Sequence, residues 1–302
     1  MFKKSFKEIE PENLKKKSSF DQKAEFESFR NASPFRLQLL KWIGSKQRYA
    51  QKIIEHFPSK YGRYIEPFLG SAGILAALHP EKAFASDVFP PLMEIWTCLK
   101  KHPETLIKWY EDRLRYYQVN PQAYFCIRDR YNESPNGADL LFLSRCCYGG
   151  ILRFRKSDGY MSTPIGSHLP IGVDEFRKRV YLWHDRVKGT TFDTCDYREA
   201  FARARSGDLV YCDPPYNLSQ NIIYGSHNFS FADLIGEVEI LRARNVKVFM
   251  SIDSIDLFPL AKEVFHQSHV ISAGKSKLNN FYGERRRNYE KKEYLLSTES
   301  KR

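Results

Sequence analysis

Short apolar runs bounded by turn residues occur in two separate parts of the chain. Two of them lie near the start, and each is followed by a segment whose apolar residues recur at helical spacing. Four more follow after residue 189. A repeated order of strand, turn and helix is typical of an open sheet covered by helices. The pattern predicts an α/β fold with a doubly wound mixed sheet, whose strands are expected at 63–68, 82–87, 190–197, 207–216, 246–253 and 292–298.

The segment between these two groups has a different pattern. From about 95 to 147 the apolar residues keep the spacing of helices. Residues 148–172 are rich in glycine, aromatic and basic residues, and Asp158-Gly159 is a turn signal for a β-hairpin. We therefore expect a basic polar arm at 1–34, a sheet domain built from 35–94 and 176–302, and an insertion at 95–175 that carries helices and the hairpin.

Charge and composition narrow the class of partner. The 302-residue chain has a formal net charge of +12 at pH 7, which favours a polyanionic partner such as nucleic acid. The alternative is a basic protein whose charge has no relation to nucleic acid. The chain has no apolar run long enough to span a membrane, and its lysine-rich start is unlike a secretory signal, so we expect a cytoplasmic protein with no membrane partner. The six cysteines lack zinc spacing, so free thiols and no metal site are expected.

The predicted strand at 207–216 ends in Asp213-Pro214-Pro215-Tyr216. In open α/β sheets, ligands bind at the carboxyl ends of strands. Proline has no N–H group, so a carboxylate followed by prolines presents acceptors and no donors. An exocyclic amino group of a base offers two matching donors, and Tyr216 offers a flat face for a base rotated out of a duplex. The alternative is a Pro-Pro turn that closes the strand, with Asp213 as a cap.

This tetrapeptide resembles the catalytic motif [DNS]-P-P-[YFW] of amino-group methyltransferases. Residues 36–298 resemble the Dam-like α group of DNA adenine-N6 methyltransferases, in which the cofactor motif comes first, target recognition next and DPPY last. The resemblance implies an S-adenosylmethionine-dependent methyltransferase fold, a target-recognition role for the insertion, and methylation of N6 of a flipped adenine in double-stranded DNA. It also implies that the protein is a monomer. If a cognate restriction endonuclease exists, the two proteins would act on the same DNA site without forming a complex.

Other segments resemble the cofactor motifs of that family, namely KWIGSK at 41–46, IEPFLGSAG at 65–73, the strand end at Asp87, and FDTCDYREAF at 192–201. The resemblance implies a lysine that reaches the cofactor carboxylate, glycines that let the backbone approach closely, and an aspartate that binds the ribose diol. Asp196 has a second interpretation as a helix N-cap, because Glu199 stands three residues on. Ser45 and Ala72 replace glycines of the family pattern. The implied cofactor-binding residues are Trp42, Lys46, Glu66, Phe68, Gly70, Asp87, Asp196, Tyr197 and Asp213.

The stretch from 144 to 166 resembles the DNA-binding region of the same family. Arginine can grip guanine edges, lysine can neutralise phosphate, and an aromatic ring can fill the gap left by a flipped base. The implied DNA-binding residues are Arg145, Tyr148, Arg153, Arg155, Lys156 and Tyr160. The hairpin sequence departs from that of the family, so no recognition sequence transfers to this chain. The polar segment after DPPY, which includes Asn217, Tyr224 and Phe229, is predicted to form a lid.

Two alternatives remain open at the level of sequence. One is methylation of a different amino nitrogen, on cytosine N4, RNA adenine or a protein glutamine, although those enzymes more often begin the motif with Ser or Asn. The other is a DNA-binding subunit that has lost catalysis. The presence of Asp213, Trp42, Lys46 and Asp87 together argues against such a loss.

Overall fold

The computed structural model describes residues 37–155, 157–215, 229–253, 259, 261–275 and 290–299. The predicted N-terminal arm lies outside these residues. The described strands are β1 (Tyr64–Glu66), β2 (Ala83–Asp87), β3 (Thr190–Thr194), β4 (Leu209–Cys212), β5 (Lys247–Ile252), β6 (Gln267–Lys275) and β7 (Glu290–Ser297). The described helices are η1 (Lys46–Tyr49), α2 (Ala50–Ile54), α3 (Gly73–Leu78), α4 (Pro90–Lys101), α5 (Pro103–Val119), α6 (Ala123–Glu133), α7 (Gly137–Cys146), η2 (Tyr148–Gly150), α8 (Val173–Arg186), α9 (Tyr197–Ala202), α11 (Phe231–Ala243) and α12 (Ala261–Val264).

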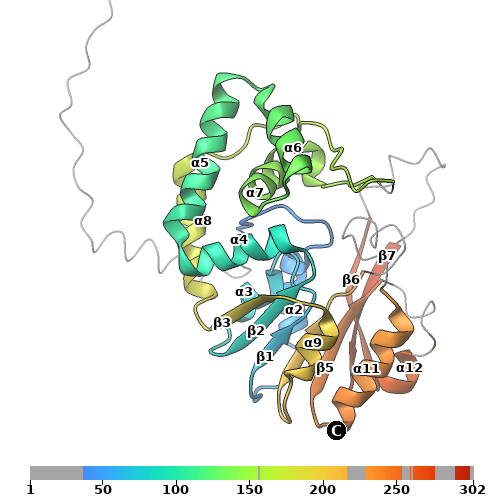
Figure 1. Cartoon of the computed structure of the whole chain (residues 1–302). Coiled ribbons are helices and arrows are strands. Elements are labelled where there is room, and N and C mark those ends of the chain that lie inside the picture. The colour runs from blue at the N-terminus through green and yellow to red at the C-terminus, as the bar shows by residue number, and fades with distance from the viewer. Residues whose placement is uncertain are drawn as a thin grey trace, which may run out of the picture. The chain divides into compact units, whose positions relative to one another are not determined.

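The seven described strands form one sheet in the order β3-β2-β1-β4-β5-β7-β6 (Figure 1). The first five are parallel to one another, whereas β7 is antiparallel to both β5 and β6. The strand order reverses between β1 and β4, which is the kind of point where open α/β sheets bind ligands. The predicted doubly wound mixed sheet is confirmed, and so is each predicted strand. The seventh strand, β6, is not predicted by the sequence pattern.

Helices bury both faces of the sheet. Successive side chains of a strand point to opposite faces, so each strand contributes to both cores. On β4, Leu209 and Tyr211 join the core beneath α2, α3, α4 and α8. Val210 and Cys212 join a second core beneath α9, α11 and α12. A strand that is buried on both sides is apolar throughout, and this explains the continuous run LVYC before Asp213.

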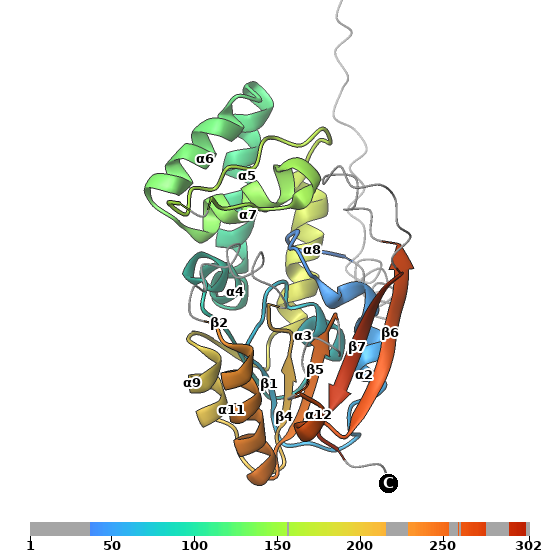
Figure 2. The same ribbon diagram turned by 90° about the vertical axis from the view of Figure 1, so that its right-hand side faces the viewer.

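Helices α5, α6 and α7 lie together near the carboxyl edge of the sheet, where they pack against α4 and α8 (Figures 1 and 2). The helical spacing seen in the sequence produces the buried stripe of α5, which consists of Leu106, Ile107, Tyr110, Leu114 and Tyr117. These helices occupy the middle of the predicted insertion, and its role in target recognition stays a prediction. Within the described ranges, no helix combines the length and apolar character that a membrane span requires.

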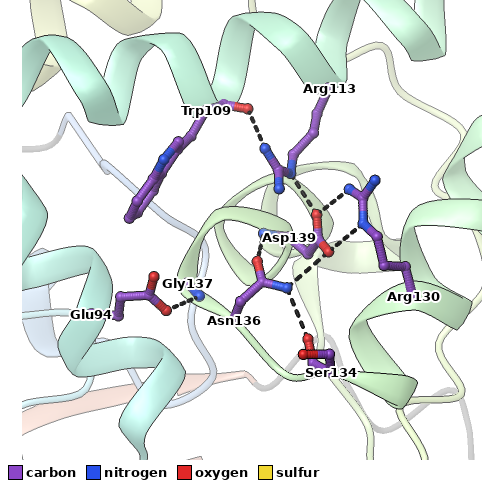
Figure 3. A network of polar contacts seen from close by, with 8 residues as sticks. All are labelled: Glu94, Trp109, Arg113, Arg130, Ser134, Asn136, Gly137 and Asp139. Atoms are coloured by element: carbon purple, nitrogen blue, oxygen red, sulfur yellow. Dashed lines mark hydrogen bonds and ion pairs between the residues drawn. The ribbon is translucent and has the colours of Figure 1, made fainter.

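A buried carboxylate ties these three helices together (Figure 3). Asp139 of α7 has no exposed surface. Its Oδ1 accepts a hydrogen bond of 2.6 Å from Nε of Arg113 in α5, and its Oδ2 accepts one of 2.8 Å from Nε of Arg130 in α6. The side-chain amide of Asn136, the N-cap of α7, donates a third bond of 3.0 Å. Nη2 of Arg130 donates a fourth bond, of 2.5 Å, to Oδ1. Four donors thus satisfy the two oxygens of this buried charge.

The predicted basic hairpin is present in the residues described around Asp158-Gly159. Phe154 and Met161 form an antiparallel bridge, and the amide of Arg155 donates a 2.9 Å bond to the carbonyl of Tyr160. Gly159 has φ of +69°, a value that glycine adopts without strain. Lys156 lies outside the described residues.

Candidate active site

A cavity of about 440 Å³ lies at the carboxyl edge of β1, β2 and β4, next to the reversal of strand order. The residues predicted for cofactor binding or catalysis that line it are Trp42, Lys46, Glu66, Phe68, Gly70, Asp87, Asp196, Tyr197, Asp213, Pro214 and Pro215. Tyr216 and the predicted lid residues Asn217 and Tyr224 lie outside the described residues, whereas Phe229 lines the cavity. Segments that are far apart in the chain thus contribute to one site.

A buried lysine joins two carboxylates at one side of the cavity. Nζ of Lys46 lies 2.8 and 2.9 Å from the two carboxylate oxygens of Asp213, and 2.9 Å from Oε1 of Glu293. It also donates a 3.1 Å bond to the carbonyl of Gly44. Burial lowers the pKa of Lys46, but the two carboxylates outweigh burial and raise it above its ordinary value. Lys46 is therefore charged at neutral pH, and its predicted contact with a cofactor carboxylate stays a prediction.

Glu66 at the end of β1 is a buried acid of the cavity. Its side chain is 2% exposed, and the hydroxyl of Tyr64 donates a 2.8 Å bond to its Oε2. Burial raises the pKa of Glu66 to about 8, and the nearby charge of Asp213 acts in the same direction. At neutral pH Glu66 is therefore largely protonated.

The turn after β1 contains the residues that correspond to one of the family glycine patterns. Gly70 has φ of +47°, and a Cβ atom there would lie 3.2 Å from the Trp42 ring. Ala72 adopts the left-handed conformation with φ of +53°, which glycine enters more readily than alanine. At Gly73, a Cβ atom would lie 2.9 Å from the backbone nitrogen of Gln47. The turn is therefore packed directly against the segment that carries Lys46.

Replacing Gly73 by alanine is expected to lower the free energy of unfolding by about 2 kcal/mol, because the added methyl group collides with backbone that cannot move aside cheaply. Gly236 in the middle of α11 is the matched control, since nothing lies within 4 Å of the Cβ position there. Gly236→Ala should raise stability by about 0.5 to 1 kcal/mol, because alanine favours helix. Chemical denaturation of both variants measures the difference, and equal stability of the two would contradict this account of the turn.

Asp87 lies where β2 ends and faces the same turn. Its side chain is 8% exposed and accepts hydrogen bonds of 3.0 Å from the amide of Gly70 and 3.1 Å from the amide of Phe89. Burial raises the pKa of Asp87 to about 6, although these amide bonds act in the opposite direction. The carboxylate is thus held rigidly at the cavity wall with a pKa near neutrality.

Aromatic rings form the wall of the cavity on the side of α9. The Phe68 and Tyr197 rings are stacked with centroids 5.4 Å apart, and the Phe229 ring lies edge-on to Phe68 at 6.0 Å. The hydroxyl of Tyr197 is buried and has no hydrogen-bond partner among the described residues. Asp196 accepts a 3.0 Å bond from the amide of Arg198 as the N-cap of α9, so the alternative interpretation as an N-cap is confirmed, and its side chain also lines the cavity.

The predicted DNA-binding residues fall into two groups. Tyr148, Arg153 and Arg155 are exposed, and the Arg155 guanidinium lies 4.3 Å from the centroid of the half-buried Tyr160 ring. Arg145 differs, because its side chain is only 6% exposed and donates bonds of 3.0 and 2.9 Å to the carbonyls of residues 38 and 39. This core position is inconsistent with the predicted DNA contact of Arg145, whose guanidinium instead satisfies buried backbone acceptors.

Glu293 and Tyr211 also belong to the site but were not predicted from the sequence. The hydroxyl groups of Tyr211 and Ser251 are hydrogen-bonded at 2.6 Å, and Tyr211 lines the cavity behind Asp213. A signal for Glu293 does exist in the sequence, since it is an acidic residue directly before the apolar run YLL of a predicted strand. That signal does not reveal the orientation of the strand, which decides the edge of the sheet at which Glu293 lies.

A family model described as D12 class N6 adenine-specific DNA methyltransferase matches residues 42–275 of the chain. The chain belongs to this family. The matched range contains each of the cavity residues named above, whereas Glu293, which pairs with Lys46, lies beyond it. Members of a methyltransferase family with this sheet use S-adenosylmethionine, and the cavity lies where open α/β sheets bind ligands.

Several named relatives are similar to this chain. A DNA adenine methylase of Vibrio cholerae is 28% identical over 59% of the chain and 64% of its own length, and the retron Ec67 DNA adenine methylase of Escherichia coli is 29% identical over 59% and 63%. The type II methyltransferase M1.LlaDCHI of Lactococcus lactis is 26% identical over 80% and 87%. The chain thus spans less than two thirds of the first two relatives. A solved precorrin-6y C5,15-methyltransferase of Geobacter metallireducens, with a TM-score of 0.36, 10% identity and coverage of 86% and 92%, is too distant to support an argument.

Proposed function

We propose that this protein is a site-specific DNA methyltransferase that methylates N6 of an adenine flipped out of double-stranded DNA. The observation that carries this proposal is the position of Asp213, which is followed by two prolines at the rim of the cavity and held through both oxygens by Lys46. An oriented carboxylate beside backbone carbonyls suits an amino group with two N–H donors.

The residues around the cavity fit S-adenosylmethionine. The volume of about 440 Å³ is in the range of small-molecule sites, and the wall combines stacked aromatic rings with two carboxylates. The buried hydroxyl of Tyr197 has no protein partner among the described residues, which suits a polar contact with a ligand. The residues that would hold the cofactor are Trp42, Phe68, Gly70, Asp87, Asp196 and Tyr197. When bound, S-adenosylmethionine supplies a methyl group that its sulfonium makes electrophilic.

Asp213 and the carbonyl of Pro214 are the groups proposed to act on the target base. Hydrogen bonds from the amino group to these acceptors hold the nitrogen in a pyramidal form and direct its lone pair toward the methyl group. Tyr216 is proposed to stack on the flipped base. The amine carries a positive charge after transfer and is then acidic, so Asp213 orients the amino group and need not be a strong base.

The DNA is proposed to approach across the hairpin region, where Tyr148, Arg153 and Arg155 are exposed and Tyr160 is half-buried. Lys156, which lies outside the described residues, is part of the same proposal. The net charge of +12 and the exposed arginines support this direction of approach.

We further propose that the enzyme acts as a monomer in the cytoplasm. A functional pairing with a restriction endonuclease is also proposed, because M1.LlaDCHI and M.FokI are named as type II methyltransferases.

Sequencing of modified bases in cells that express this chain tests the proposed function. We expect N6-methyladenine within one recurrent DNA sequence, which reports the target base and the recognition site together. N4-methylcytosine or methylated RNA would favour the alternative amino-group targets. Unmodified nucleic acid in cells that contain the folded protein would favour a non-catalytic DNA-binding subunit and contradict the proposal.

The affinity for S-adenosylmethionine is expected to weaken several-fold as the pH falls through about 6, the value to which burial raises the pKa of Asp87. Below that pH Asp87 is protonated and is a weaker acceptor for a ribose diol. Calorimetric titrations at about pH 7 and about pH 5 measure the change, and Glu66, with a pKa of about 8, stays largely protonated at both. Asp87→Asn should bind weakly at both pH values, and an affinity of the unaltered protein that does not change would contradict this assignment.

A further inference from the structure

We infer that Glu293 is a positioning residue for methyl transfer, which acts through Lys46 to orient Asp213 and to maintain its strength as an acceptor. The inference rests on the proposed function. Glu293 lies outside the range matched by the family model and carries no expected role from the sequence. Its carboxylate belongs to the same buried ion cluster as the proposed catalytic aspartate.

The topology of the sheet brings Glu293 to this position. β7 is antiparallel to β5, so its first residues lie at the carboxyl edge where the parallel strands end (Figure 2). Tyr294 pairs with Ile252, the last residue of β5, which places Glu293 at the level just beyond the end of that strand. Asp213 likewise follows the last residue of β4. Lys46 bridges the two carboxylates, which belong to strands on either side of β5.

The N–H groups of the Lys46 ammonium are shared among several acceptors. An ammonium group has three N–H bonds, and here Gly44, Glu293 and Asp213 are all within hydrogen-bond distance of it. Glu293 accepts from one N–H bond of Lys46. The single positive charge of Lys46 is therefore shared between two carboxylates, and it holds Asp213 without fully neutralising it. A carboxylate has about four lone-pair sites, so an Asp213 that is held in this way can still accept from an amino group.

Burial gives this arrangement its strength. The side chains of Lys46, Asp213 and Glu293 are 6%, 19% and 17% exposed. Charges that are largely removed from water interact more strongly than exposed pairs. We therefore expect loss of the Glu293 charge to strengthen the attraction between Lys46 and Asp213 and to make the Asp213 oxygens weaker acceptors for the target amino group.

Glu293→Gln tests the inference, since the amide keeps the shape and one acceptor oxygen but removes the charge. We expect kcat for DNA methylation to fall about tenfold, the size expected for one charge-assisted hydrogen bond. KM for DNA and the calorimetric affinity for S-adenosylmethionine should stay within about twofold of the original values, because the substitution weakens an interaction that stabilises the transition state and not the bound substrates. Glu293→Asp, which keeps the charge but is shorter, should retain more of kcat than Glu293→Gln.

Glu299→Gln is the matched control, because Glu299 is also a partly buried glutamate paired with a lysine, Lys247, at 3.0 Å. It should leave kcat unchanged. An unchanged kcat in Glu293→Gln would overturn the inference, and so would a loss matched by an equal loss of folded protein in thermal melting. If Glu293→Gln fails to fold, Glu293→Asp decides the matter, since a kcat equal to that of the original protein would overturn the inference. Absence of methylation by the original protein would instead overturn the proposed function.

Discussion

Replacing Asp213 by alanine is expected to reduce the rate of methyl transfer to DNA by about 10³-fold, while the protein stays folded. The reason is that the carboxylate is the charged acceptor proposed for the target amino group, and loss of one preorganised group of this kind has a cost of that order. Lys46 keeps Glu293 as a partner in the variant, so no buried cation is left unpaired. The fold should therefore survive a change that removes the activity.

Transfer of labelled methyl groups from S-adenosylmethionine to DNA measures this effect. Asp193→Ala is the matched control, because Asp193 is also an ion-paired aspartate of a sheet strand, with Arg203 at 2.8 Å, but lies 42% exposed and outside the cavity lining. Asp213→Asn should also be impaired, since the amide keeps the shape but loses the charge. Activity of Asp213→Ala close to that of the Asp193→Ala control would contradict the proposed mechanism.

Asp139→Ala is expected to lower the free energy of unfolding by about 3 kcal/mol, because it leaves arginine side chains of α5 and α6 without their buried partner. Asp129→Ala in α6 is the control, since Asp129 is 54% exposed and pairs with Arg128 at 3.2 Å. An exposed pair contributes less than about 1 kcal/mol. Urea denaturation of both variants measures the difference, and equal stabilities would contradict a structural role for the network in Figure 3.

The effect of Asp139 on stability should depend on pH. Burial raises the pKa of Asp139, but hydrogen bonds from Arg130 and Asn136 and the charge of Arg113 outweigh it and hold the pKa below its ordinary value. The stabilisation is therefore fully present above the pKa of an unfolded aspartate, about 3.9, and is lost as the pH falls through the lower folded value. The gap in stability between the original protein and Asp139→Ala should consequently narrow in acid.

Much of the fold follows from local pattern. The alternation of strands and helices predicts six of the seven described strands, because a strand buried on both faces needs a continuous apolar run such as LVYC. β6 is missed because its sequence, QSHVISAGK, mixes polar and apolar residues without such a run. Asp158-Gly159 predicts the hairpin because its turn requires a residue with positive φ.

The sequence predicts those residues of the candidate site that lie at the ends of strands. The sequence by itself determined that Asp87 and Asp213 end strands and that glycines follow β1, and parallel strands bring such residues to one edge. Only the tertiary structure decided that Lys46 joins Asp213 to Glu293 and that Arg145 is buried. The physical reason is that local pattern encodes the backbone of each element, whereas burial and ion pairing depend on the direction and register of segments far apart in the chain.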